Sequence, residues 1–205
     1  MATDVKARFA TGGTATSTTA LAAEQDPADG AALTLTAAAA TFAQADDGSC
    51  TVQKVTLTSG SGDDNSDVTY TIVGTDGMGA SQTEDLVGGA GGVTVTSTKF
   101  YNTVTSITGN GAASVDITAG VTSTGMHAVL WTGRTRIKGM HGVISSADNF
   151  LFKTTSSTGA TVMTIPADAG DLDPYIPDDG VLFSAGAYLP MDQGDITGLT
   201  VFLDA

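Results

Sequence analysis

The sequence predicts an all-β protein, and three features of its composition support this. Glycine is abundant, with 26 among 205 residues, and threonine is the commonest polar residue. Of the 22 acidic residues only Glu24 and Glu84 are glutamates, while Lys and Arg together number 8. Asp, Thr and Gly form helices poorly, whereas Thr suits the pleated, half-buried surface of a strand. We therefore predict two antiparallel β-sandwich or barrel-like modules, preceded by an extended N-terminal arm.

The arm is predicted over residues 1–30. It contains a polar, low-complexity stretch at 11–19 and a turn at 26–30. Residues 5–9 have the composition of a short strand, but one that forms only when another part of the protein holds it. We expect this arm to gain order on assembly, by reaching an adjacent subunit.

An Ig-like β-module is predicted over residues 31–122. Apolar and polar residues alternate in short runs, and Gly- or Asp-rich turns separate the runs, as in a sandwich or barrel. The expected strands are 33–36, 52–58, 68–73, 81–87, 93–96, 100–107 and 115–117. Residues 37–45 are the best local candidate for a helix, although the stretch is short and lacks a cap.

A second β-module, a sandwich or barrel, is predicted over residues 123–205. Apolar runs recur at 127–131, 143–144, 150–152, 162–165, 181–183, 188–189 and 199–203, with an alternating run at 134–138. Four of the five prolines follow residue 165, whereas glycine dominates the earlier loops. This shift predicts a junction around 120–125. The core of this module is expected to contain Trp131, Phe150, Phe152, Phe183 and Phe202.

The charge and apolar pattern exclude several classes of protein. A net charge of −14 disfavours both nucleic acid and an anionic membrane surface, which attract basic patches. The N-terminus lacks the apolar region of a signal peptide, and no run reaches the ~18 apolar residues of a membrane-spanning helix. Cys50 is the single cysteine, so no intramolecular disulfide can form. We expect folding in a cytoplasm.

Catalytic motifs are not evident. Nucleophilic catalysis needs a base, usually His, within reach of Ser or Cys. The two histidines, His127 and His141, lie in apolar or strand-like contexts, and no Gly-x-Ser-x-Gly sequence occurs. The aspartates cluster in turns, where Asp commonly hydrogen-bonds its own backbone. We therefore predict that the chain is not an enzyme and uses no cofactor.

The best metal candidate is the loop containing Asp63, Asn65 and Asp67. These alternating oxygen ligands match the start of a calcium-binding loop, but Val68 stands where such a loop has glycine, and Gly74 where it has glutamate. Hydrogen bonding within the loop is therefore the favoured interpretation. The Gly88–Gly92 stretch lacks the Lys-Ser/Thr of a phosphate loop and is interpreted as a connection between strands.

The few basic residues fall mainly into two stripes. Arg134, Arg136 and Lys138 alternate along one predicted strand, and Lys6 and Arg8 do so in the arm beside Phe9. One interpretation is a solvated strand face that pairs with neighbouring aspartates, at about 0–1 kcal/mol per pair. The other is an interface with an acidic partner surface, such as another subunit.

The strand and turn patterns resemble those of two phage modules. The stretch 64–77, together with Thr83-Glu84, residues 93–100 and residues 104–107, resembles a small β-module that recurs in structural proteins of tailed bacteriophages. The second half is similar to another short phage virion module, through residues 132–139, 175–181 and 194–202. The two resemblances cover roughly residues 31 to 205.

The resemblance implies a virion component: first a capsid decoration (cement) protein, second a tail-tube, head–tail connector or tail-fibre component. It further implies homotrimers that bind the major capsid protein on the outer capsid surface, after assembly in the bacterial host cytoplasm. It carries no catalytic residues. A receptor- or glycan-binding adhesin is an alternative of another class, because such proteins also use Ig-like modules.

Overall fold

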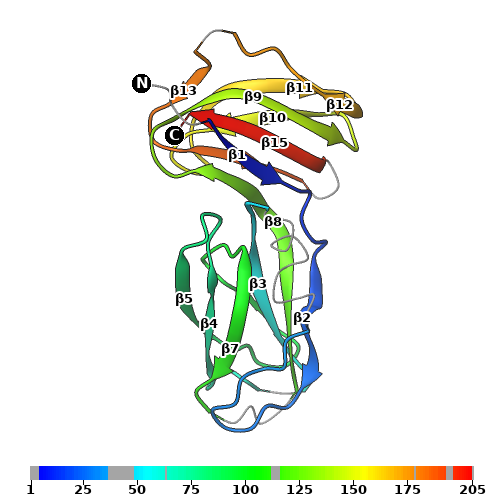
Figure 1. The fold of residues 1–205 in the computed structure, drawn as a ribbon. Coiled ribbons are helices and arrows are strands. Elements are labelled where there is room, and N and C mark those ends of the chain that lie inside the picture. Colours follow the sequence, from blue (N-terminus) through cyan, green and yellow to red (C-terminus); the bar gives the residue numbers. More distant parts are fainter. Residues whose placement is uncertain are drawn as a thin grey trace. The chain divides into compact units, whose positions relative to one another are not determined.

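The computed structural model describes residues 5–36, 49–62, 64–111, 116–177, 179–192 and 196–204. These residues form fifteen strands and no helix, which confirms the all-β prediction. The helix candidate at 37–45 lies outside the described residues. The chain divides into two compact units (Figure 1). The first contains residues 1–13, 48–52 and 125–205, and the second contains residues 14–47 and 53–124.

The first unit contains two antiparallel sheets. One sheet has the order β1 (Val5–Ala10), β15 (Ile196–Asp204), β9 (Thr135–Ile144) and β12 (Gly170–Leu172), and β13 (Val181–Phe183) also pairs with β9. The other has β11 (Thr161–Ala167), β10 (Asp148–Lys153), β14 (Ala187–Pro190) and the C-terminal part of β8 (Ile117–Trp131).

Both sheets of the first unit contribute to one core. Strand alternation sends every second side chain inward, so Ile137, Leu199 and Val201 from one sheet pack with Leu130 and Phe152 from the other. The unit is therefore a β-sandwich. Phe150 and Phe183 are buried as the sequence predicts, and Trp131 is half-buried against the core. Phe202 corrects the prediction, since it points away from this core and is 38% exposed.

The second unit is also a sandwich. A three-stranded sheet has the order β5 (Ser81–Val87), β4 (Thr69–Thr75) and β7 (Thr103–Gly109). Opposite it lie β2 (Ser17–Gln25), the N-terminal part of β8, most of β3 (Thr51–Ser59) and β6 (Thr94–Thr96). Along β4, half-buried and buried residues alternate without interruption, and its inward residues Tyr70 and Ile72 pack with Val55 and Leu57. In Figure 1, β4, β5 and β7 lie on one side of this unit and β2, β3 and β8 on the other.

The stretch at which the sequence places a junction, 120–125, lies inside a single 15-residue strand, β8. Its glycines are strand residues. At Gly120 a Cβ would clash with the backbone of Ser17 and Thr18, so glycine permits β2 to pair closely. Gly125 has a φ of +73°, which glycine adopts without strain, and the division into units falls directly before it.

Within the predicted arm, the described residues 5–30 contribute strands to both units. β1 belongs to the sheet of the first unit and β2 to that of the second. The expected strand at 33–36 is reduced to one bridge between Ala32 and Thr108, beside which the Leu33 amide donates to the Ile107 carbonyl. A search of the described residues for a helix long and apolar enough to cross a membrane finds none.

Candidate functional site

The solvent side of the sheet formed by β1, β15, β9 and β13 carries a concentration of exposed apolar side chains. We call it the outer face. Nine large hydrophobic residues are exposed among the described residues, and five of them belong here: Val5, Val143, Leu182 and Phe202 on the strands, and Tyr175 on the loop that follows β12. Register explains the arrangement, because Val5 lies opposite Asp204, and Leu182 opposite Arg136, on the side turned away from the core. A sheet face that carries this many exposed apolar side chains is a candidate interaction surface.

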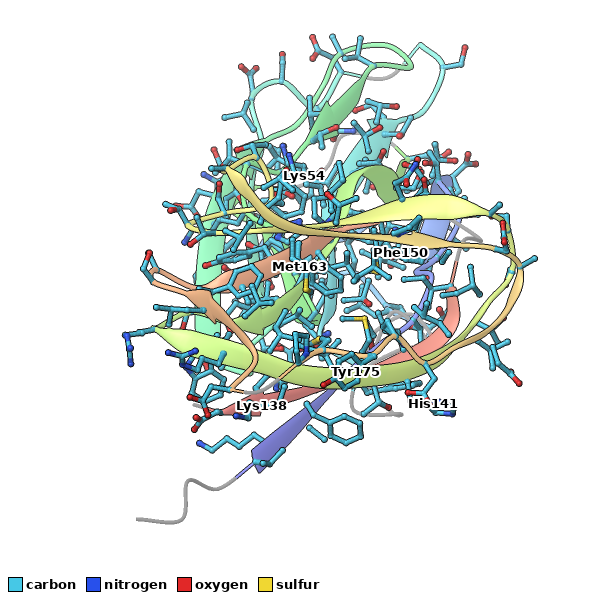
Figure 2. All side chains as sticks on the ribbon, turned by 90° about the horizontal axis from the view of Figure 1, so that it is seen from above. Lys54, Lys138, His141, Phe150, Met163 and Tyr175 are labelled. Atoms are coloured by element: carbon cyan, nitrogen blue, oxygen red, sulfur yellow. The ribbon has the colours of Figure 1, made fainter. Side chains whose placement is uncertain are left out.

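A hollow of about 390 Å³ lies within the outer face. It forms because β12 and β13 pair with β9 on either side of residues 138–141, and the chain between them loops away. Its lining includes Lys138, His141, Asp173, Tyr175 and Phe202. Tyr175 is 87% exposed and lies between Pro174 and Pro177, whose fixed φ restricts the loop. In Figure 2, Tyr175 of the loop after β12 is drawn between Lys138 and His141, which belong to β9.

The two basic stripes come together in one sheet, but on its opposite sides. β15 lies between β1 and β9. Lys6 and Arg8 pair in register with Leu203 and Val201, which are buried core residues, so both cations project toward the core side. The Lys6 ammonium lies 4.7 Å from the centre of the Trp131 ring. The Arg8 guanidinium donates to the Val129 carbonyl at 3.2 Å.

The second stripe projects from the outer face. Arg136 and Lys138 alternate with buried residues of β9, and both lie against Gly180: the Arg136 guanidinium donates to its carbonyl at 3.3 Å. Arg134 differs from the prediction, because it is exposed in the bend before β9 and is not a strand residue. Phe9 also belongs to this side, opposite Thr200, and its ring packs on Gly198.

Asn65, the central residue of the calcium candidate, is fully buried in the second unit. Its amide donates to the Ser59 hydroxyl at 3.2 Å, and its Oδ1 accepts a hydrogen bond from the Tyr70 hydroxyl at 3.2 Å. Asp67 is exposed, and Asp63 lies outside the described residues. Hydrogen bonds from the Ser66 hydroxyl and amide lower the pKa of Asp64, the Asx pattern of a turn. Asn65 thus joins this loop to the core.

The remaining titratable candidates are dispersed. His127 is buried in β8 with its Nδ1 2.9 Å from the Gly125 carbonyl, and burial lowers the pKa of its imidazole. His141 is exposed on the outer face. Burial raises the pKa of the Cys50 thiol to about 11, although the nearby Arg8 acts in the opposite direction. The described residues include no group of three or more His, Cys, Asp or Glu side chains arranged to hold a metal.

Sequence reasoning missed two features. Tyr175 drew no attention as an exposed aromatic, although the prolines on either side of Tyr175-Ile176 indicate a restricted loop. The second feature is Glu84, which lies in β5. Its two carboxylate oxygens accept from the Thr98 amide at 2.6 Å and the Lys99 amide at 2.9 Å, which fixes the turn after β6. No local pattern around Glu84 indicates that role.

No family model, no curated protein and no solved structure matches this chain.

Proposed function

We propose that this chain is a non-enzymatic structural protein of a tailed-phage virion, which decorates and stabilises the capsid shell. The observation that carries the proposal is the outer face. It combines exposed apolar and aromatic side chains with Arg136 and Lys138, and aromatic residues and Arg are enriched where proteins bind one another. The resemblance of residues 31–205 to phage virion modules supports a tailed-phage virion as the particle.

The proposed role is mechanical. Copies of the chain bind the major capsid protein where shell subunits meet, and burial of the outer face across those junctions opposes the internal pressure of the packed genome. Charge on the face is mixed, since Asp171 and Asp204 pair in register with Val143 and Arg136. A partner surface with both apolar and charged groups therefore fits better than a purely basic or purely acidic one.

The attachment surface is tested with expanded, decoration-free heads of the phage that encodes the chain. Leu182→Asp, at a residue 39% exposed on the outer face, is compared with Leu151→Asp, at a residue 38% exposed on β10. The outer-face variant should bind heads at least ~10-fold more weakly, because it buries a charge in an apolar contact, whereas the control should bind as the wild type does. Equal binding by both variants rejects the outer face as the attachment surface.

The location in the virion is tested separately by copy number. Quantitative mass spectrometry of purified virions should find the chain in hundreds of copies and in heads separated from tails. Recovery only from purified tails, at tens of copies or fewer, would instead identify a tail-tube, connector or fibre component and reject shell decoration.

Glycan binding is the second candidate, and the hollow favours it. Tyr175 and Phe202 offer aromatic surface, while Asp173 accepts and Lys138 donates hydrogen bonds, a set that matches the hydroxyl groups and apolar face of a sugar ring. Saturation-transfer NMR with a panel of neutral and uronic-acid tetrasaccharides tests it. At least one tetrasaccharide should show a saturation-transfer signal, and Tyr175→Ala should abolish that signal. The absence of a signal from every member of the panel rejects glycan binding in the hollow.

A further inference from the structure

The N-terminal strand β1 makes a separable contribution to the first unit. Of its six residues only Ala10 is fully buried, and Val5, Lys6 and Ala7 are exposed. β1 is the end strand of its sheet and pairs with β15 from Val5 to Ala10. Removing it would leave β15 as an open strand edge.

The place that β1 occupies, which we call the seat, consists of four contacts with the body of the first unit. β15 provides backbone pairing, the Trp131 ring lies under the Lys6 ammonium, the Val129 carbonyl accepts from Arg8, and the Cys50 amide donates to the Phe9 carbonyl at 2.7 Å. All four groups follow β1 in the sequence and belong to one unit. The seat would therefore offer the same contacts to the β1 of a second copy.

In the connection after β1, the backbone can change direction only at the two residues Gly12 and Gly13. Before them, the Thr11 carbonyl accepts from the Thr51 hydroxyl at 2.9 Å, a contact that would be exchanged together with β1. After them, Thr14 is held by Gln53, whose Oε1 accepts from the Thr14 amide at 2.8 Å and whose Nε2 donates to the Thr14 carbonyl at 2.7 Å. Between these two fixed points lie Gly12 and Gly13, and Gly13 has a φ of +69°. Glycine reaches that conformation and extended ones alike, so β1 can leave in another direction without strain.

We propose that β1 is exchanged between copies: the N-terminal strand of one chain fills the seat on the next, with Gly12–Gly13 as the hinge. The partner is a second copy of this chain, and the interface is the β1–β15 pairing with its side-chain contacts. Exchange replaces each contact by its identical counterpart, so the balance between closed and exchanged forms depends on the hinge and on protein concentration. The proposal does not depend on shell decoration.

The experiment introduces the cysteine pair Ala7→Cys and Phe202→Cys, which lie directly opposite in register. The Phe9 carbonyl accepts its hydrogen bond on the side away from β15, so Phe9 and Thr200 form a non-hydrogen-bonded pair. Ala7 lies two residues earlier on the same strand, so Ala7 and Phe202 form a pair of the same kind. The Cα atoms of such a pair are about 4.5 Å apart, a spacing that suits a disulfide. Oxidised glutathione accepts the two electrons and two protons as the bond forms. The native Cys50 remains a buried thiol and does not compete.

Isotopically light and heavy chains are mixed, unfolded, refolded together and oxidised at high concentration. Exchange predicts light–heavy species linked by the introduced pair, and a closed strand predicts only disulfides within one chain. The pair Thr71→Cys and Asp85→Cys, opposite in the β4–β5 hairpin, is the control that should link within one chain, and each single variant measures random linkage. Exclusively intrachain linkage of the 7–202 pair overturns the proposal.

A hinge variant gives an independent test. Gly13→Pro forbids the φ of +69° that the closed form uses, since proline holds φ near −65°. It should raise the interchain share of the 7–202 disulfide and shift the unmodified chain to larger species in sedimentation. The proposal is rejected if Gly13→Pro unfolds without any increase in interchain 7–202 disulfides and the parent forms this disulfide only within one chain.

Discussion

The ammonium of Lys6 lies over the ring of Trp131, with 4.7 Å from Nζ to the ring centre. The contact joins the first strand of the chain to the end of β8, so Lys6, although exposed, helps to hold β1 in the seat. The sequence predicts Lys6 as part of a solvated face or a partner interface, whereas in the structure Lys6 helps to hold the N-terminal strand in place.

Replacing Lys6 by Ala should loosen β1. Exposed cation–π contacts contribute about 0.5–1 kcal/mol, so amide hydrogens of β1 should exchange roughly two- to fivefold faster, while those of β4 should keep their rates. Hydrogen exchange monitored by NMR measures both in one sample. Lys153→Ala, on β10, is the matched control, and equal β1 rates in both variants would show that the contact contributes nothing.

Replacing Asn65 by Ala should destabilise the second unit. It leaves the buried Tyr70 hydroxyl without its partner, at a cost of about 1–3 kcal/mol, whereas the Ser59 hydroxyl keeps its hydrogen bond to the Gly89 carbonyl. Urea unfolding measures the loss, and Asp67→Ala, at an exposed residue of the same loop, should change stability by less than about 0.5 kcal/mol. A stabilisation of the wild type by millimolar Ca²⁺ that Asn65→Ala abolishes would contradict this structural role.

The stability of the folded protein should fall below pH 6.5 in part because of His127. Burial lowers its pKa in the folded protein below the ordinary value of 6.5, so folding favours the neutral imidazole. The contribution of His127 to the free energy of unfolding is therefore complete above pH 6.5, and it is lost as the pH falls from 6.5 through the folded pKa, by at most about 1.4 kcal/mol per pH unit.

Urea unfolding of His127→Gln and of the wild type between pH 5 and 7.5 tests this. The variant should have the flatter profile below pH 6.5, and His141→Gln, which removes the exposed histidine, should retain the wild-type profile. Parallel profiles for wild type and His127→Gln would contradict the assignment.

Replacing Thr155 by Gly should stabilise the first unit. Thr155 has a φ of +73° in the turn between β10 and β11, a conformation that costs a β-branched residue of the order of 1 kcal/mol. Thr155→Gly should therefore stabilise the first unit by about that amount, because the backbone bond from its amide to the Ala185 carbonyl is retained. The thermal midpoint measures the gain. Thr158→Gly, in the same turn, should give none.

The strand content of this protein could be predicted because strand periodicity is a local property. In β4 the apolar residues recur at every second position, and half-buried and buried side chains alternate along the strand as that pattern requires. The continuity of β8 could not be predicted in the same way. Gly120 suggests a turn in the sequence, but it lies within β8, where the backbone of Ser17 comes too close for any residue with a Cβ.

Candidate residues on the outer face were only partly predictable, for a related reason. Alternation within one segment places Arg136 and Lys138 on a common side, and Lys6 and Arg8 on a common side, but it does not relate the two segments to each other. The register of β1 on β15 and of β15 on β9 decides that Lys6 and Arg8 face the core side and that Arg136 and Lys138 face solvent. Phe202, an expected core residue, is exposed through the same register.

The sequence by itself determined the strand-forming character of the chain, its acidic surface and the positions of most turns, because these depend on residue type and on neighbours along the chain. Only the tertiary structure decided which strands meet, that the N-terminal residues 5–10 complete the first unit, and that Tyr175 stands beside Lys138 and His141 on the outer face. Those relationships join residues far apart in the sequence, and they follow from the pairing of strands and the packing of two sheets, which no single segment encodes.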